Sequence, residues 1–461
     1  MKINPQVFRE YDIRGYVDRD LSPEFAQLLG RAYAQMVAER TSAPIAVGHD
    51  CRVTSPVYAE ALARGIASEG RDVLLTGMGP TPQLYFSIFQ NDLGGGIQVT
   101  GSHNPSDMNG FKICVGKQTL SGEDIQHLRK RMEQLAESKS HGTVAGKVSE
   151  LPVRKDYSDW IVENVKPHMG KRKLKVVCDA GNGVGGVVGP AVLRALGVEV
   201  IELYCEPDGT FPNHHPDPTE MKNIQDLQER VIEEKADLGI GWDGDADRIG
   251  AVDERGDVIF GDMLLLIFGR DILKKKPGAT IIGDVKCSSR LFSDLEEKGA
   301  KAVMWKTGHS LIKGKLRELG GDLAGEMSGH IFFGHRYFGF DDALYASARL
   351  VEILSNTPAK ASELLGDLAP AFSTPEIRVD CAEDIKFQIP EAARRYFADY
   401  EVNTIDGVRI EFEKGWGLIR ASNTQPALVL RFEAQSEDLL RQYESLVRST
   451  VEEIQTSLLT S

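Results

Sequence analysis

The chain has few cysteines, no long apolar run and no apolar leader at its N-terminus. Its six cysteines are scattered over 461 residues without a CxxC pair, so neither a zinc site nor a disulfide framework is indicated. No segment reaches the roughly 18 uninterrupted apolar residues that a membrane span needs. We therefore expect a cytoplasmic protein with no membrane partner.

Positive charge is also in deficit. The 68 acidic residues outnumber the 54 basic ones, which gives a formal net charge of −14. Such a balance argues against nucleic acid as a general partner. Any anionic ligand must then be held by a local cluster of cations. The length predicts several domains rather than one core, and 41% hydrophobic with 26% charged residues is typical of globular proteins.

Short β-branched runs alternate with amphipathic helical stretches over most of the chain, which predicts α/β domains with largely parallel or mixed sheets. Strands are expected at residues 45–48, 72–77, 96–101, 175–180 and 279–284, and helices at 56–70 and 123–139. A polar stretch at 138–150, a turn at 253–256 and an interruption of helical periodicity at 368–374 mark boundaries. These give domains at 1–148, 149–254, 255–368 and 369–461.

The last of these ranges has a different order of strands and helices. A strand and a short helix precede a meander over 408–434 and a final helix. Apolar residues repeat along one face of that helix with a period of 3.6, which predicts a small α+β domain with a one-sided sheet. The residues of this face are Leu439, Leu440, Tyr443, Leu446, Val447, Val451 and Ile454.

The sequence GWDGDADRIG carries the strongest chemical signal. Asp243, Asp245 and Asp247 alternate directly after an apolar strand, and such carboxylates can converge as hard oxygen ligands for Mg²⁺. A twelve-residue calcium loop counted from Asp243 would end on Glu254, but Arg248 stands where that loop needs glycine. The expected flanks are strands rather than helices. The pattern therefore favours a strand-end Mg²⁺ site.

A second glycine-rich turn, CDAGNGVGG, satisfies GxGxxG through Gly181, Gly183 and Gly186, with Glu202 about twenty residues on. This spacing is that of a dinucleotide fingerprint, and an NAD-linked dehydrogenase is the corresponding alternative. No second nucleotide-binding feature accompanies the match. We interpret it as a tight turn between a strand and a helix.

The stretch VTGSHNPSDMNGFK, residues 99–112, places Ser102, His103 and Lys112 near the end of a buried strand. Adjacent residues do not usually present a serine and its base to each other, so a hydrolase triad is a poor explanation. A phosphorylated Ser102 fits better. Backbone N–H groups, His103 and Lys112 could hold its oxygens, with the aspartate loop supplying a metal to one of them.

Two further loops offer polar side chains. GEMSGH presents Glu326 and Ser328 two residues apart, as suits neighbouring sugar hydroxyls, although for that loop by itself a plain turn is the favoured interpretation. RASNTQP offers a dense set of donors suited to gripping a phosphate. This set consists of Arg420, Ser422, Asn423 and Thr424, with Arg431 further along the same stretch.

Together these motifs resemble the α-D-phosphohexomutase superfamily, and within it the phosphomannomutase/phosphoglucomutase branch. YDIRG, TGSHNP, DGDADR, GEMSGH and RASNTQP occur in the family order over the whole chain. The resemblance implies three related α/β domains with mixed sheets and a C-terminal α+β domain like the TATA-binding-protein fold, around a central cleft. It also implies a monomeric, Mg²⁺-dependent enzyme, active when Ser102 is phosphorylated and activated by hexose 1,6-bisphosphate.

The same resemblance implies roles for single residues. PhosphoSer102 would pass its phosphoryl group between the 1- and 6-positions of mannose and glucose phosphates through a hexose 1,6-bisphosphate. Ser102 and the three aspartates would hold the metal, and Arg248 would add charge. Proton handling falls to Lys112, His103 or Arg14, and the sequence does not choose among them. The residues implied to line the substrate site are Tyr11, Lys286, His309, Glu326, Ser328, His330, Arg420, Ser422, Asn423 and Thr424.

Alternative functions stay open at this point. A sugar-phosphate phosphatase would pass the seryl phosphate to water, and a sugar-phosphate sensor could dispense with Ser102 and the aspartates. Phosphoglucosamine mutases carry another variant of the GExSGH loop, and Met327 in this sequence resembles the members that accept both glucose and mannose phosphates.

Overall fold

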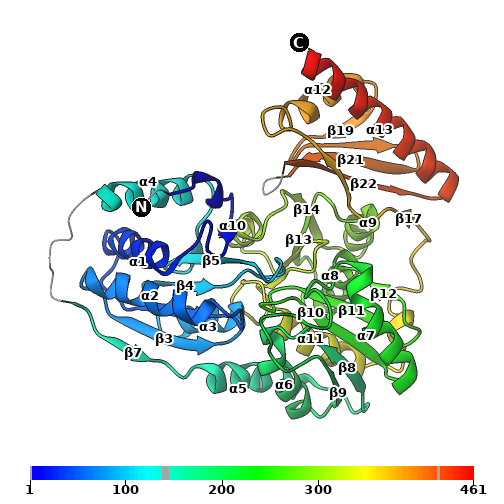
Figure 1. The fold of residues 1–461 in the computed structure, drawn as a ribbon. Helices are drawn as coiled ribbons and strands as arrows, with labels where there is room; N and C mark the ends of the chain where they lie inside the picture. Colours follow the sequence, from blue (N-terminus) through cyan, green and yellow to red (C-terminus); the bar gives the residue numbers. More distant parts are fainter. Residues whose placement is uncertain (1–2, 138–144, 423–425, 461) are drawn as a thin grey trace.

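The computed structural model describes residues 3–137, 145–422 and 426–460. These residues form four sheets, which follow one another along the chain. Figure 1 shows the first sheet and its helices as one lobe in blue and cyan, with the second and third, in green and yellow, beside it. The C-terminal domain, in orange and red, stands apart from the other three. The predicted fold class is confirmed.

The first sheet is mixed, with strand order β1-β5-β4-β2-β3-β7 and β6 beside β5. Helices α1, α2 and α4 share one apolar cluster on one face, and α3 contributes to another. Ser22 accepts a hydrogen bond from the N–H of Phe25 and so caps the start of α1. The elements are β1 (Ile13–Tyr16), α1 (Pro23–Ala38), β2 (Ile45–His49), α2 (Ser55–Ser68), β3 (Val73–Met78), α3 (Thr81–Gln90), β4 (Gly95–Val99), β5 (Met108–Val115), β6 (Gln118–Thr119), α4 (Glu123–Glu137) and β7 (Val148–Glu150).

The second sheet has the order β12-β11-β10-β8-β9, in which β8, β9 and β10 are parallel and β11 and β12 are antiparallel. Helix α7 covers one face, whereas α5 and α6 lie in the cluster that contains α3. The elements are α5 (Arg154–Val165), β8 (Lys175–Asp179), α6 (Gly189–Ala195), β9 (Glu199–Leu203), α7 (Met221–Glu234), β10 (Leu238–Trp242), β11 (Ile249–Asp253) and β12 (Val258–Ile259).

The third sheet repeats the plan with the order β14-β13-β15-β16, where only the pairing of β15 with β16 is antiparallel among the described strands. Helix α10 packs on one face, and α8, α9 and α11 belong to the shared cluster. The elements are α8 (Gly261–Lys275), β13 (Thr280–Asp284), α9 (Ser289–Glu297), β14 (Lys301–Trp305), α10 (His309–Leu319), β15 (Leu323–Gly325), β16 (Ile331–Phe333) and α11 (Ala343–Ser355).

One apolar core therefore runs through the first three domains. Each sheet has an apolar cluster of its own on one face, while the helices of the other faces merge into a common interior. Trp242 at the end of β10 lies in that interior, and its indole N–H donates to Ser347 of α11 at 2.9 Å. Burial of this extent ties the three sheets together, so the loops at their strand ends hold fixed relative positions.

The fourth sheet is antiparallel among its described strands, with order β17-β22-β21-β20-β19 and β18 beside β22. Helices α12 and α13 pack together on one face. Val447, Val451 and Ile454 of the predicted apolar face are buried, but Leu446 is 40% exposed and lies outside that face. The elements are β17 (Phe372–Ser373), β18 (Ile377–Asp380), α12 (Gln388–Tyr396), β19 (Glu401–Asn403), β20 (Val408–Phe412), β21 (Gly415–Ala421), β22 (Ala427–Ala434) and α13 (Glu437–Thr460).

The C-terminal domain meets the third domain through few apolar side chains and two buried cations, Arg409 and Arg431, of which Arg431 donates to the carbonyl oxygen of Lys286. Trp416 and Leu418 pack against Val285. The Arg409 guanidinium donates to the carbonyl oxygens of Val285 and Cys287, both at 2.8 Å, and lies 3.9 Å from the centre of the Trp416 ring. This contact is much smaller than the core shared by the other three domains.

The predicted strands and helices of the first three domains are confirmed to within a few residues. The turn at 253–256, where the sequence placed a boundary, joins β11 to β12 within one hairpin. The second sheet therefore continues past residue 254. Among the described helices, none is both long and apolar enough to cross a membrane.

Two glycines let α1 and α2 touch backbone to backbone. A Cβ on Gly30 would lie 2.3 Å from the carbonyl oxygen of Leu62, and one on Gly65 would lie 2.0 Å from that of Gln27. Neither distance is compatible with a side chain, so the crossing of the two helices depends on hydrogen at both positions.

We predict that Gly65→Ala lowers the free energy of unfolding by roughly 1–3 kcal/mol, because the methyl group forces the helices apart. The matched control is Gly314→Ala in α10, where a Cβ meets no atom within 4 Å. Gly314→Ala should leave the free energy of unfolding unchanged or raise it by roughly 0.5–1 kcal/mol, since alanine has a higher helix propensity than glycine at an exposed position. Urea unfolding followed by circular dichroism measures the stability of both variants. A midpoint of Gly65→Ala equal to that of the wild type would contradict the prediction.

Candidate functional site

Ser102 lies just beyond the C-terminal end of β4, an inner strand of the first sheet, and only 1% of its surface is exposed. Its backbone is left-handed, with φ of 50°, and its N–H donates to the hydroxyl of Thr100 at 2.9 Å. The seryl Oγ donates to Asp243 Oδ2 at 2.8 Å and lies 3.0 Å from His103 Nδ1. The serine of the first domain is therefore in direct contact with the aspartate loop of the second.

The expectation that Ser102 and His103 do not face each other is wrong. A non-glycine residue rarely adopts positive φ, and this conformation of Ser102 brings the adjacent ring within hydrogen-bonding distance. Asp243 lies 3.9 Å from the same nitrogen, Nδ1, so the ring is not held between a serine and an acid as in a hydrolase triad. Burial and the nearby Arg248 and Arg14 lower the pKa of His103 well below its usual value.

Asp243, Asp245 and Asp247 lie in the turn between β10 and β11, and all three are fully buried. One carboxylate oxygen from each falls within 4.8 Å of the others. Strands flank the turn on both sides, as predicted, which distinguishes it from a helix-loop-helix calcium site. The turn is tight enough that Ala246 is held at φ of 57°.

Lys112 of β5 balances part of this charge. Its Nζ donates to Asp245 Oδ2 at 2.7 Å and also to Asp247 Oδ2. Burial would lower the pKa of Lys112, but the aspartates raise it above its usual value, so it remains an ammonium. Burial, with Asp245 and Asp247 close by, raises the pKa of Asp243.

The aspartate turn fits a divalent cation. Three carboxylates against the Lys112 ammonium and the neighbouring Arg248 guanidinium still leave an excess of negative charge in a buried site, which is costly unless a further cation compensates it. The Oδ1 atoms of Asp245 and Asp247 are buried without a hydrogen-bond partner among the described residues. Such oxygens are the ligands that Mg²⁺ prefers. Thr81 donates to the other oxygen of Asp245 and fixes that carboxylate.

A histidine pair from the third domain borders the aspartate turn. His330 Nε2 accepts from Arg248 Nε at 3.0 Å, and its Nδ1 lies 3.1 Å from Asp341 Oδ2. His309 stacks on His330 with ring centres 5.6 Å apart. Lys313 donates to the other oxygen of Asp341 at 2.9 Å.

Sequence reasoning missed Asp341 and Lys313. The only signal was a pair of acids, Asp341 and Asp342, inside the apolar stretch that leads into α11. Asp342 caps that helix, and Asp341 faces the histidines. A helix cap explains one acid of the pair but not both.

The loop after β14 brings Tyr11, His309 and Glu326 together. The Tyr11 hydroxyl donates to the carbonyl of Thr307 at 2.9 Å, and Gly308 packs directly against its ring. Glu326 Oε1 accepts from the N–H of Gly308 at 2.6 Å, and burial raises the pKa of Glu326. Ser328 lies two residues after Glu326, in the loop between β15 and β16, and is half-buried.

Lys286 and Arg420 each pair with a carboxylate that the sequence did not single out. Lys286 Nζ donates to Glu376 at the start of the fourth domain. Arg420 Nε donates to Asp406 Oδ2 at 2.7 Å, and the same oxygen accepts from the N–H of Thr307 at 2.9 Å. These contacts join the fourth domain to the third beside the site.

The remaining predicted residues are placed as follows. Arg14 donates to Asp12 at 2.7 Å and to Asn104 at 2.9 Å. Asn104 belongs to the serine loop, residues 100–107 between β4 and β5, so Arg14 borders Ser102. The N–H of Ser422 donates to the carbonyl of Ala427 within the predicted phosphate loop. Asn423 and Thr424 lie outside the described residues.

The glycine-rich turn after β8 serves the packing of the second domain. A Cβ on Gly186 would lie 1.9 Å from the carbonyl oxygen of Cys205. Glu202 forms an ion pair with Arg194 at 2.6 Å, with both side chains about half exposed. The glutamate is thus engaged on the surface, in keeping with the interpretation of this motif as a tight turn.

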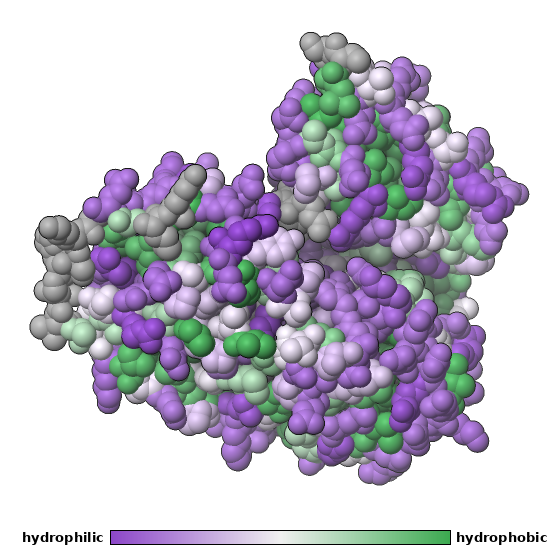
Figure 2. All heavy atoms as spheres, in the orientation of Figure 1, coloured by the Kyte–Doolittle hydropathy of each residue, from purple (hydrophilic) through white to green (hydrophobic). Residues whose placement is uncertain are grey.

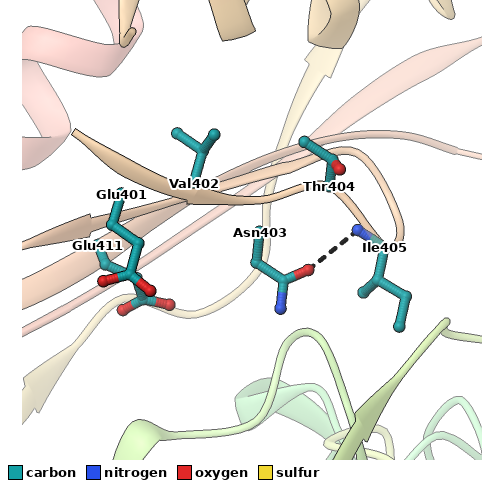
Figure 3. A pocket seen from close by; sticks show the side chains of 6 residues that line it. All are labelled: Glu401, Val402, Asn403, Thr404, Ile405 and Glu411. Atoms are coloured by element: carbon teal, nitrogen blue, oxygen red, sulfur yellow. Dashed lines mark hydrogen bonds between the residues drawn. The ribbon is translucent and has the colours of Figure 1, made fainter. Parts of the chain in front are cut away.

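The surface in Figure 2 is mainly hydrophilic, with a recess where the C-terminal domain meets the others. A separate open hollow of about 460 Å³ lies on β19 and β20 of the C-terminal domain (Figure 3). It contains none of the predicted site residues. Its lining consists of Glu401, Val402, Asn403, Thr404, Ile405 and Glu411.

Comparison with known proteins agrees with this geometry. Residues 5–139, 155–256 and 260–372 match the phosphoglucomutase/phosphomannomutase alpha/beta/alpha domains I, II and III, and residues 376–449 match the C-terminal domain of that family. A phosphomannomutase/phosphoglucomutase of Pseudomonas aeruginosa is 45% identical over 454 residues, which cover 98% of this chain and 96% of the relative.

A phosphoglucomutase of Neisseria meningitidis is 44% identical, with 97% of this chain and 96% of the relative covered. A crystal structure of a phosphoglucomutase/phosphomannomutase family protein from Burkholderia thailandensis superposes with a TM-score of 0.91 at 40% identity, and covers 98% of both chains. The chain therefore belongs to the phosphoglucomutase/phosphomannomutase family.

Proposed function

We propose that this protein reversibly transfers a phosphoryl group between the 1- and 6-positions of mannose and glucose phosphates. Ser102 would carry the group, and a hexose 1,6-bisphosphate would be the intermediate. One observation carries the proposal: the Ser102 hydroxyl lies 2.8 Å from Asp243, inside a buried turn of three carboxylates that Lys112 only partly neutralises. That is a site for a phosphoryl group and a cation rather than for a free carboxylate cluster.

Phosphoryl transfer needs positioning and charge neutralisation more than covalent chemistry from side chains. Asp243, Asp245 and Asp247, with one oxygen of the phosphorylated Ser102 side chain, would hold Mg²⁺, which would neutralise charge on the transferring group. Lys112 and Arg248 supply further positive charge on either side of the turn. Arg14 of β1 donates a hydrogen bond to Asn104 of the serine loop.

Proton transfer has two well-placed histidines. His103 Nδ1 faces the seryl oxygen, and burial keeps this ring neutral by lowering its pKa. His330 stands on the other side of the aspartate turn, 3.7 Å from Asp247 Oδ1. We assign His330 to the hydroxyl of the sugar and His103 to the seryl side.

The third and fourth domains would hold the sugar and its distal phosphate. Glu326 and Ser328 would contact ring hydroxyls, with Tyr11, Lys286 and His309 around them. Arg420, Ser422, Asn423 and Thr424 would take the phosphate that is not reacting. Lys286 is paired with Glu376, and Arg420 is paired with Asp406. The substrate would therefore displace both carboxylates.

Several finer assignments belong to the same proposal. They are Mg²⁺ as the metal, hexose 1,6-bisphosphate as activator, a monomeric state and a cytoplasmic location. We propose domain limits of 1–150, 151–259, 260–368 and 369–461, in which the first limit moves past β7, because β7 pairs with β3, and the second moves past β12, because β12 pairs with β11.

We predict that Ser102→Ala removes nearly all mutase turnover, because no side chain then accepts the phosphoryl group. Incubation with glucose 1,6-bisphosphate should add one phosphate to the wild-type protein at Ser102 and none to the variant, as measured by intact mass and peptide mapping. Release of free phosphate from mannose 1-phosphate, without the 6-phosphate isomer, would indicate a phosphatase instead.

A second prediction concerns the cation. Asp245→Asn should weaken Mn²⁺ binding, measured by calorimetry, at least about 10-fold, because it removes a charged ligand from the turn. Activity should fall in parallel. Asp257→Asn, on an exposed turn of the same sheet, is the charge-matched control and should leave the Mn²⁺ affinity unchanged. Equal affinity in the Asp245 variant would remove this turn as the metal site.

A third prediction tests the phosphate loop. Arg420→Ala should raise KM for mannose 1-phosphate by roughly 10- to 100-fold, since a charge-assisted hydrogen bond contributes roughly 1.5–3 kcal/mol. Arg441→Ala, on the exposed surface of α13, controls for loss of a positive charge from the same domain. An unchanged KM in the Arg420 variant would show that the distal phosphate binds elsewhere.

A further inference from the structure

Arg52 is the most heavily hydrogen-bonded side chain beside the serine loop, and the proposed chemistry does not use it. It lies between β2 and α2 with 1% of its surface exposed. Its Nη2 donates to the carbonyl oxygens of Ser102 at 2.8 Å and Asn104 at 2.6 Å. Its Nη1 donates to those of Pro105 at 2.6 Å and Met108 at 3.0 Å.

Four carbonyl groups, three of the serine loop and that of Met108 where β5 begins, thus converge on one guanidinium. Only arginine offers several rigidly directed N–H donors in one plane, and an ammonium cannot reproduce that fork. Gly101 makes the approach possible, because a Cβ there would lie 2.6 Å from Arg52 Cζ. Asp50 lies 3.3 Å from Arg52 Nε and accepts from the Thr100 hydroxyl at 2.7 Å, which in turn receives the N–H of Ser102.

The second domain closes on the other side of the same group. The ring of Phe211 stacks on the guanidinium at 4.9 Å, although Phe211 itself has φ of 51°. A large side chain in that conformation is strained, so the surrounding contacts must hold it there. Gly244 of the aspartate turn packs on the carbonyl oxygen of Ser102, where a Cβ would lie 2.3 Å away.

The carbonyl oxygen of Ser102 is therefore fixed by Arg52 from the first domain and by the aspartate turn from the second. We infer that Arg52 is a positioning residue for the nucleophile: it locks the serine loop in the geometry that keeps the Ser102 hydroxyl against Asp243, and Phe211 couples that geometry to the second domain. This inference rests on the proposed function for its kinetic consequences but not for the loop geometry.

The kinetic test compares Arg52→Lys with the wild-type enzyme. The variant keeps the charge but loses the fork, so kcat with mannose 1-phosphate should fall about 100-fold, the cost of misplacing a reacting group by about 1 Å. KM should change less than about threefold, because the residues proposed to bind sugar and distal phosphate lie in other loops. Phosphorylation of Ser102 by glucose 1,6-bisphosphate, followed by intact mass, should slow by the same factor as kcat.

Arg172→Lys is the matched control. Arg172 also donates to two backbone carbonyls, those of Thr357 and Ala359, and pairs with Asp237, but it joins the second and third domains away from the serine loop. Its kcat should stay within about threefold of wild type. Phosphorylation of Ser102 in Arg52→Lys at the wild-type rate would overturn the inference, and so would an equal loss in the two variants.

Hydrogen exchange separates this inference from the proposed function. In Arg52→Lys, amides of residues 102–108 should exchange at least about tenfold faster, while peptides from the C-terminal domain stay unchanged. A wild-type protein that never takes phosphate on Ser102 would refute the proposed function and leave this measurement valid. Should Arg52→Lys not fold, Phe211→Leu decides, because it keeps the arginine but removes the ring, and unaltered exchange in residues 102–108 would overturn the inference.

Discussion

The site depends on one electrostatic constraint: three carboxylates are buried in one turn, directly against a serine from another domain. Charge of one sign cannot be buried at this density without compensation. Lys112 reaches the turn from β5, Arg248 and His330 border it, and a divalent cation would complete the balance. The elements that carry these groups must therefore meet at one point, beside the apolar interior that the first three domains share.

The distribution of apolar surface explains which parts can hold this geometry. The first three domains share one continuous core, so the serine loop, the aspartate turn and the histidine pair are held by the same packed interior. The fourth domain is attached mainly through Arg409 and Arg431, a small apolar contact and ion pairs such as Lys286 with Glu376. The groups proposed to react therefore lie in the part of the molecule with the shared core, and the proposed distal phosphate site lies in the part with fewer apolar contacts.

The sequence predicted the elements well where local pattern decides. Strand ends after apolar runs located Ser102 and the three aspartates, and helical periodicity located α2, α4 and α13. It failed where a contact joins distant segments. Asp341, Asp406 and Glu376 each pair with a predicted cation or histidine more than ten residues away, and no local pattern marks such partners. The contact between the Ser102 hydroxyl and the His103 ring depends on the left-handed backbone of Ser102, and no sequence pattern predicts that conformation for a serine.

The ion pair of Arg420 with Asp406 bears on how the proposed distal phosphate site would release its ligand. A phosphate ester that binds at Arg420 would replace a resident carboxylate instead of meeting an unpaired guanidinium. Its net affinity would be the difference between two similar interactions, so binding would be moderate and dissociation fast. Such an exchange would suit an enzyme whose bisphosphate intermediate must dissociate from this site, reorient and bind again through its other phosphate.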